Sequence, residues 1–396
     1  MSLTWVSVLA LAFTAAPATT TRATASAPAP NAAVYYQQAF DLYSRLTVKE
    51  RQIVYDFSDA PLDEEVGRLL QHSADALGLL HRGAGIHECA WPSVQTDEWP
   101  GASFPHLAKA RNLARLAALR ARWRFSRGDP AGAFDDLADA MALGRHVARG
   151  SLLVGFFVGI AIEDMARTWA ADNLLGQDAK VPRAFEHRLA ALPPAPTLRE
   201  TVLSEKKAVL VWFRTAVAAA EKDRQLELLR EWAGNEDLPR AVLDDTGGTK
   251  EGYERVLAAM GPFFDELAAF EPKSGPQFEA VLQDFNNRIE KAPPPTYACL
   301  HPLARAWSLY AADQMRRAML RAAIAVVLNG PDALKTIKDP IDGDPFDYEA
   351  LPDGGFRLTS KCVLVVPGKE FTTLTVGRTP KSETRPAGTR STGGKG

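Results

Sequence analysis

The segment Phe104–Gly150, FPHLAKARNLARLAALRARWRFSRGDPAGAFDDLADAMALGRHVARG, decides the fold class because it carries two helical patterns separated by a turn. Its apolar residues recur every three or four positions, which is typical of the buried face of a helix. Gly128 suits the end of a first helix, Asp129 the N-cap of a second and Pro130 its first position. The segment therefore predicts an antiparallel helical hairpin. The apolar positions are Leu107, Leu113, Leu116, Leu119 and Trp123 before the turn, and Phe134, Leu137, Ala138, Met141 and Val147 after it.

The same periodicity extends over residues 33–330, which we predict to form a helical domain built as an antiparallel bundle or array of hairpins. Residues 152–162 are apolar on all sides and too few to cross a bilayer, so they predict a central helix buried by its neighbours. We expect residues 234–250 to form a loop. The other predicted helices cover residues 34–46, 62–83, 198–232, 251–270, 277–291 and 303–328.

Beyond Gly330 the pattern changes to short strand-like runs separated by turn signals such as Asp353-Gly354-Gly355 and Pro367-Gly368. Residues 331–377 therefore predict a small C-terminal antiparallel β-sheet of three or four strands, which must pack on helices to be stable. The tail, residues 378–396, is rich in Gly, Ser, Thr and Pro, and this composition predicts disorder.

The N-terminus predicts export. Leu3–Ala16 is apolar, uncharged and shorter than the ~20 residues of a membrane span, and small residues follow it. We interpret residues 1–25 as a signal peptide and residues 26–32 as a flexible spacer. The mature chain would then be periplasmic or extracellular, without a stable membrane span. An uncleaved N-terminal anchor is the alternative.

Charge and cysteine content narrow the function classes. The 396 residues include 46 basic and 48 acidic side chains, giving a net charge of −2. A nucleic-acid partner is disfavoured, because such binding needs a basic excess. Cys89, Cys299 and Cys362 match no metal motif. One pair could be oxidised in an exported protein, but free, buried thiols fit a chain this poor in cysteine better.

Two stretches of the sequence resemble known families. The GDP-A-G-A turn and its flanking helices resemble one tetratricopeptide unit, without a recurring ~34-residue repeat. The same helical core, with Cys89 and Trp91 in the preceding loop, resembles a family of uncharacterised exported bacterial proteins. The stretch DPIDGDPFDYEALPDGGFRLTS (339–360) resembles the C-terminal hairpin of type II secretion major pseudopilins, in which nearby loop acids can hold calcium.

Candidate binding residues are few. The loop at residues 84–103 contains Trp91 and Trp99, which are amphipathic aromatics of the kind that anchor partners. Packing within the loop is the alternative role for both. No sequence motif proposes a catalytic residue, and we expect no required cofactor.

Two groups of residues suggest metal sites, and one run of arginines suggests an anion site. Asp342, Asp344 and Asp347, next to Gly343, could supply part of a structural calcium site, although Asp-Gly and Asp-Pro are also plain turn formers. His81, His87 and His106 could join in a zinc site of a metal-dependent hydrolase. The run Arg120, Arg122, Arg124 and Arg127 points in several directions on a helix and predicts a solvated, ion-paired face rather than a phosphate clamp.

These observations together favour an exported helical scaffold that binds a protein or peptide partner in the cell envelope. The alternatives are the metal-dependent hydrolase and a pseudopilin-related envelope component.

Overall fold

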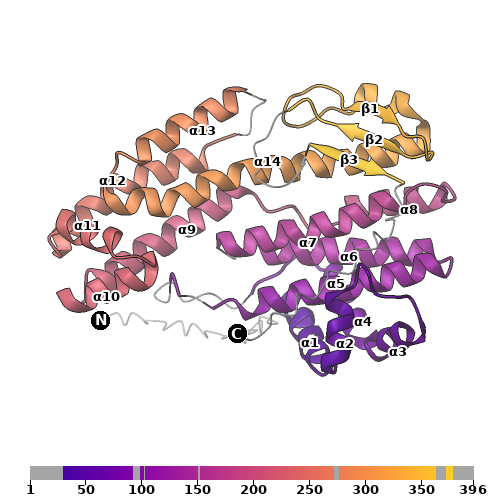
Figure 1. The fold of residues 1–396 in the computed structure, drawn as a ribbon, viewed down its shortest axis with the longest axis horizontal. Helices are drawn as coiled ribbons and strands as arrows, with labels where there is room; N and C mark the ends of the chain where they lie inside the picture. The colour runs from indigo at the N-terminus through magenta and orange to yellow at the C-terminus, as the bar shows by residue number, and fades with distance from the viewer. Residues whose placement is uncertain are drawn as a thin grey trace, which may run out of the picture. The chain divides into compact units, whose positions relative to one another are not determined.

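The computed structural model describes residues 30–91, 99–101, 103–149, 152–271, 276–362 and 372–377. This part of the chain is mainly helical and ends in a small three-stranded antiparallel sheet, which confirms the predicted fold class (Figure 1). The predicted signal peptide, most of the spacer and the predicted disordered tail lie outside the described residues.

The N-terminal region contains more helix boundaries than the sequence pattern predicted. The helix expected over residues 62–83 is two helices that meet at Ser73, whose buried N–H still bonds to the carbonyl of Leu69. A helix that we did not predict begins after Thr47, where Thr47 and Glu50 form a reciprocal capping box that the sequence does display. The four helices are α1 (Ala32–Ser44), α2 (Val48–Tyr55), α3 (Glu64–His72) and α4 (Ala74–Ala84).

The predicted hairpin is confirmed as α5 (Pro105–Ser126) and α6 (Pro130–Ala148). Gly128 adopts a left-handed backbone with φ of 77°, and the Asp129 carboxylate accepts a hydrogen bond from the Gly132 N–H at 3.0 Å. Local sequence therefore specifies this turn, because each residue meets a backbone requirement of its own position.

Helix α7 (Leu153–Asp172) contains the apolar run and packs closely along α6. Glycines make this approach possible, since a Cβ added at Gly144 would lie 2.8 Å from the carbonyl oxygen of Gly159. Burial is incomplete at its start, where Val154 is exposed. Among the described helices, none combines the length and the apolar character that a bilayer span requires.

The prediction of one long helix over residues 198–232 is wrong. The chain forms α9 (Leu198–Trp212), a π-helical turn η2 (Phe213–Val217) and, after a break, α10 (Lys222–Ala233). In one straight helix Trp212 and Trp232 would stand about 30 Å apart, yet their ring centroids are 6.1 Å apart. The chain turns back because aromatic packing outweighs helix propensity. A short helix that we did not predict, α8 (Lys180–Ala190), precedes α9.

The loop expected over residues 234–250 contains a helix, α11 (Asp237–Thr246), which ends at two left-handed glycines, Gly247 and Gly248. The predicted helices α12 (Lys250–Ala268) and α13 (Pro276–Ile289) are confirmed. The last helix, α14 (Pro294–Asn329), has 36 residues and begins nine residues earlier than predicted. Proline is tolerated in its first turn because the N–H groups there have no intrahelical acceptor.

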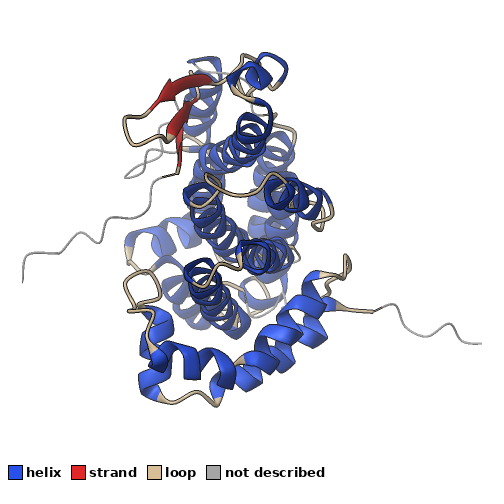
Figure 2. Ribbon diagram, turned by 90° about the vertical axis from the view of Figure 1, so that its right-hand side faces the viewer, coloured by secondary structure: helices blue, strands red, loops and turns tan. Residues whose placement is uncertain are grey.

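The C-terminal sheet follows a short 3-10 turn, η3 (Pro331–Thr336). Its strands β1 (Asp347–Ala350), β2 (Phe356–Thr359) and β3 (Thr373–Val376) pair in the order β1-β2-β3, all antiparallel. One of the strand-like runs within residues 331–377, CVLVVPG (362–368), lies outside the described residues except for Cys362. Figure 2 views many of the helices end-on and places the sheet at the edge of the helical array.

Two hydrophobic clusters hold the described chain together. Cluster 1 joins α1 to α8 with the second half of α14 and the sheet, so the sheet shares a core with the helices. Cluster 2 joins the start of α7 with η2, α9 to α13 and the first half of α14. Helix α14 therefore contributes to both clusters.

Candidate functional site

The two predicted aromatic anchors lie against different clusters. The half-buried Trp91 ring stacks on His106 at 4.7 Å between centroids, and its Nε1 donates to the His146 carbonyl at 2.7 Å. The half-buried Trp99 ring packs edge-on against Trp212 at 5.4 Å. Both tryptophans make packing contacts, which was the alternative role considered for them. A partner-binding role for Trp91 and Trp99 stays a prediction.

The three histidines of the zinc hypothesis have separate partners. His81 Nδ1 lies 2.8 Å from the Asp139 carboxylate, and His87 Nε2 lies 3.3 Å from the Ala191 carbonyl oxygen. His106 packs on Trp91. Over the residues whose placement is described, no three or more His, Cys, Asp or Glu side chains gather where they could hold a metal ion. The hydrolase hypothesis therefore has no ligand set in this part of the chain.

The acidic stretch before β1 shows turn chemistry. The Asp342 carboxylate accepts from the Asp344 N–H at 2.8 Å, and Gly343 has φ of 81°. Asp344 and Asp347 each lie 3.8 Å from the Lys361 ammonium. These interactions stabilise the turn without a metal, and calcium binding stays a prediction.

The arginine run on α5 is less solvated than predicted. Arg120 reaches the buried Asp136 carboxylate through Nε at 3.0 Å, and Arg124 Nη1 lies 3.1 Å from the same group. Arg122 donates to the Phe57 and Ala60 carbonyls instead. These side chains diverge, as their spacing predicts, and Arg120, Arg122 and Arg124 bind acceptors within the fold. Arg127 is exposed and lies over the Trp123 ring. Burial raises the pKa of Asp136 to about 6 against the opposing effect of the two arginines.

The three cysteines are free thiols. Burial raises the pKa of Cys89 to about 12 and also raises the pKa of Cys299. A nucleophilic cysteine needs a lowered pKa. Cys89 and Cys299 therefore have a structural rather than a catalytic environment.

A buried ionic layer within the described part of the chain is a polar feature that the sequence did not predict. Arg167 and Glu163 are each 1% exposed, and Asp313 is 2% exposed. Arg167 Nη2 donates to Asp313 at 2.6 Å, and Glu163 also lies within ion-pair distance of three arginines. The layer joins α6, α7 and α14 where they pass from one hydrophobic cluster to the other. Its charged members are Arg145, Glu163, Asp164, Arg167, Asp313, Arg316 and Arg317.

The ionic layer suits a structural role better than a catalytic one. Burial lowers the pKa of Arg167, but Asp313, Glu163 and Asp164 raise it by more, so the guanidinium stays charged. The acids are held by arginines, and no histidine or lysine takes part in these ion pairs. Such a layer fixes the register of three helices, because any slip would separate buried charges.

Glu205 is a second buried acid with a structural contact. It lies on α9 and accepts a hydrogen bond from the Leu153 N–H at 2.7 Å, at the start of α7. Burial raises its pKa, whereas the hydrogen bonds from Leu153 and Trp99 lower it. Leu152, the N-cap residue, has no side chain that could cap α7 itself. Glu205 therefore replaces a local cap and ties α9 to α7.

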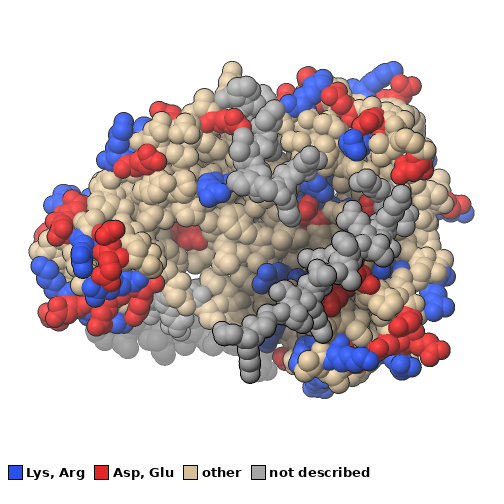
Figure 3. Space-filling model, in the orientation of Figure 1, with Lys and Arg blue, Asp and Glu red and all other residues tan. Residues whose placement is uncertain are grey.

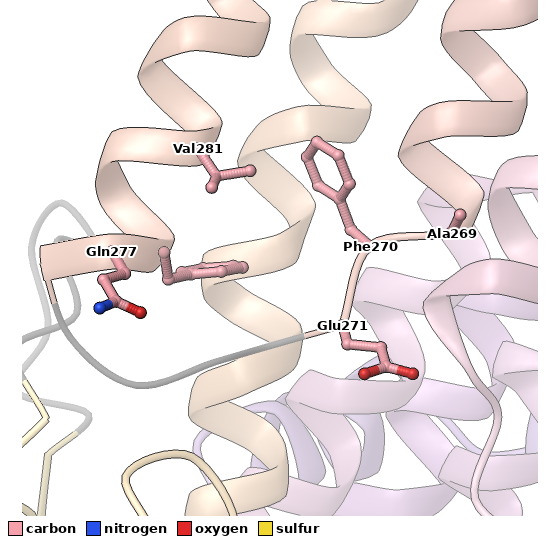
Figure 4. Close-up of a pocket in the computed structure, with 6 residues that line it drawn as sticks. Ala269, Phe270, Glu271, Gln277 and Val281 are labelled. Atoms are coloured by element: carbon pink, nitrogen blue, oxygen red, sulfur yellow. The ribbon is translucent and has the colours of Figure 1, made fainter.

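An open apolar pocket lies at the turn between α12 and α13. Its volume is about 280 Å³. In Figure 4 the Val281 side chain points from α13 toward Phe270, while Gln277 and Glu271 lie at the edge. Phe278 is buried in the pocket wall, whereas Val281 is 49% exposed. The lining residues are Ala269, Phe270, Glu271, Gln277, Phe278 and Val281.

Core contacts hold the pocket wall in place. The Phe270 ring lies 5.4 Å from the Phe285 ring and 6.2 Å from the Trp307 ring, measured between centroids. Phe285 and Trp307 are both buried in cluster 2. The pocket is thus largely pre-formed, which lowers the ordering cost of binding. Sequence reasoning assigned Phe270, Phe278 and Val281 to helices but could not show that a recess forms between them.

The described fold and pocket define a mainly helical protein with an apolar surface recess and no described metal-ligand cluster. Comparisons with known family models, with curated proteins and with solved structures find no match to this chain. The tetratricopeptide-like and pseudopilin-like resemblances therefore remain hypotheses.

Proposed function

We propose that this chain is an exported helical interaction protein that binds a protein or peptide partner in the cell envelope through the pocket at the α12–α13 turn. Export is inferred from the N-terminal sequence. The pocket carries the binding part of the proposal because it presents apolar side chains to solvent in a pre-formed recess.

The size and chemistry of the pocket favour an apolar side chain of a partner over a small polar metabolite. Its volume of about 280 Å³ lies below the range of about 300–1,000 Å³ typical for drug-sized ligands. Among the described lining residues, Glu271 and Gln277 alone bring polar side chains. A metabolite would need several convergent polar groups to orient it, whereas a Phe or Leu side chain needs mainly an apolar recess.

One anchor does not supply a stable complex. Full burial of a Leu or Phe side chain contributes about 1.5–3 kcal/mol, and micromolar affinity requires about 8 kcal/mol. The partner must therefore also contact the surface around the pocket, with the anchor at the centre of the interface. A peptide that supplies little more than the anchor should bind weakly.

The binding proposal can be tested by nuclear magnetic resonance with short capped peptides that carry one Phe in a Gly/Ser background. We expect saturable shifts of the Val281 and Ala269 methyl signals, and weaker binding in Val281→Lys, which is followed through the Ala269 methyl signal. Val154→Lys is the matched control, because Val154 is 46% exposed on α7 and lies outside the pocket. Absence of saturable shifts at Val281, or equal binding by the two variants, would reject the proposal.

The pseudopilin-related alternative makes a separate prediction. If Asp342, Asp344 and Asp347 hold calcium, adding calcium should raise the melting temperature, and combining Asp342→Ala with Asp344→Ala should remove the gain. An unchanged melting curve with calcium or chelator would exclude this alternative. The turn hydrogen bond from Asp344 to Asp342 needs no metal, so we favour the interaction function.

A further inference from the structure

We infer that the segment bound in the pocket carries a Lys or Arg next to its apolar anchor, and that Glu271 pairs with this cation. The inference rests on the proposed function, because it concerns the same pocket. It names the partner's chemistry: an apolar side chain with a neighbouring positive charge.

Glu271 is placed to serve as the acceptor. It is an exposed lining residue just beyond α12, and Figure 4 shows its carboxylate at the edge of the pocket, below Phe270. A carboxylate at the edge of an apolar recess stays hydrated while the anchor is buried. Glu271 can therefore select the residue that flanks the anchor without being buried itself.

Three neighbouring acids on α12 and α13 already have partners. Asp265 pairs with Lys206 at 2.6 Å. Glu266 and Asp284 both pair with Arg288, the latter at 2.9 Å. No ion pair joins Glu271 to another described residue, so none of the described cations offsets its negative charge at the pocket edge. Electrostatic complementarity then favours a positively charged flank and disfavours an acidic one.

The expected effect is a modest preference. An exposed ion pair changes affinity by about two- to five-fold, and a like charge at the same place weakens binding by a similar factor. The apolar anchor provides most of the affinity, and Glu271 discriminates between partners by the charge of the residue next to the anchor. Because both charges stay exposed, high salt should remove most of the preference.

The test uses three capped peptides that share one Phe and differ in the next residue, which is Arg, Gln or Glu. Binding to the full chain is followed through the Val281 methyl signals at about 50 mM and about 500 mM salt. We expect affinity to fall in the order Arg, Gln, Glu at low salt, with about two- to five-fold per step, and to converge at high salt.

Two variants assign the preference to a residue. Glu271→Gln should remove the differences in affinity among the Arg, Gln and Glu peptides, because no carboxylate remains at the pocket edge. Glu279→Gln is the matched control, because Glu279 is an exposed acid of α13 outside the pocket lining, and it should keep the full order. A preference that persists in Glu271→Gln would overturn the inference.

The remaining outcomes separate this inference from the proposed function. Equal binding of all three peptides to the unmodified chain would overturn the charge preference and leave the apolar pocket in place. If no peptide binds, both proposals fail. Val281 shifts that depend on protein concentration without peptide would show that a second copy of this chain occupies the pocket, and would also overturn the inference.

Discussion

Two glycines set how closely α6 and α7 approach each other. A Cβ added at Gly159 would lie 2.6 Å from the Ala148 Cβ and still closer to the Gly144 carbonyl oxygen. Real side-chain carbons do not approach this closely, so the helices would have to move apart. Such overpacking of a well-packed interface typically costs about 1–3 kcal/mol.

Gly159→Ala should therefore lower the free energy of unfolding by about 1–3 kcal/mol, measured by urea denaturation. Gly78→Ala is the matched control, because Gly78 lies within α4 and an added Cβ would meet no atom within 4 Å. The control should be neutral or more stable by up to about 1 kcal/mol, since alanine favours helix. Equal effects of the two substitutions would contradict the close-packing argument.

His146 gives a residue-scale prediction for pH. Its side chain is fully buried and its Nδ1 lies 2.8 Å from the Tyr36 hydroxyl. Burial lowers its pKa from 6.5 to about 4. Between these values the unfolded state binds more protons than the folded state, so the contribution of His146 to stability is lost as pH falls from 6.5 to 4.

The full pKa shift of His146 changes the free energy of unfolding by about 3 kcal/mol. Asp136 changes stability in the opposite direction over the same range, because burial raises its pKa to about 6. The test therefore compares His146→Gln with the unmodified chain at each pH by denaturant unfolding. The unmodified chain should lose more stability than the variant on acidification from pH 6.5 to 4. Parallel pH profiles would contradict the assignment to His146.

At the scale of elements, turns that depend on neighbouring residues were predicted, whereas a chain reversal that depends on distant residues was not. The Gly128-Asp129-Pro130 turn was predicted because each residue satisfies its own backbone position. The break after α9 was not predicted, because it depends on Trp212 meeting Trp232, 20 positions later in the chain. Helix α11 was missed although Leu238, Val242 and Gly247 supplied apolar spacing and a stop. The charged residues of this helix lie on its exposed face, so they do not oppose helix formation.

The ionic layer shows how elements are held in register. Arg167→Met should destabilise the chain by about 3–5 kcal/mol, because it leaves Asp313 and Glu163 buried with one cation fewer. Arg214→Met is the control, since Arg214 and Glu254 form an exposed pair whose loss should cost below about 1 kcal/mol. Denaturant unfolding of both variants checks the difference. A loss at Arg167 no larger than at Arg214 would show that the layer does not fix the helices.

At the scale of the whole described chain, surface charge agrees with the balanced composition. Figure 3 shows Lys and Arg beside Asp and Glu over α10 and α11, at the left of the view. Pairs such as Arg224 with Glu227 and Arg230 with Glu236, both at 2.8 Å, account for part of this pattern. A surface with mixed charges does not create the strong positive potential that attracts polyanions.

The sheet and the helices should unfold together because they share cluster 1. Leu374 on β3 is 3% exposed and belongs to this cluster. Leu374→Ala should therefore lower stability by about 2–5 kcal/mol, seen in the helical circular dichroism signal during denaturation. Leu203→Ala, at a position that is 40% exposed, should change it little. An unshifted helical transition in Leu374→Ala would mean that the sheet is an independent unit.

The helical class, the α5–α6 hairpin and the change to strands after Gly330 can be read from the amino-acid sequence, because they depend on periodicity and on residues that act within one turn. The ionic layer, the reversal at Trp212 and Trp232, and the pocket between Phe270 and Val281 emerge only when the chain is folded. Each of these features needs side chains from separate elements to meet. A single helix face looks the same in sequence whether it is covered by a neighbour or left open.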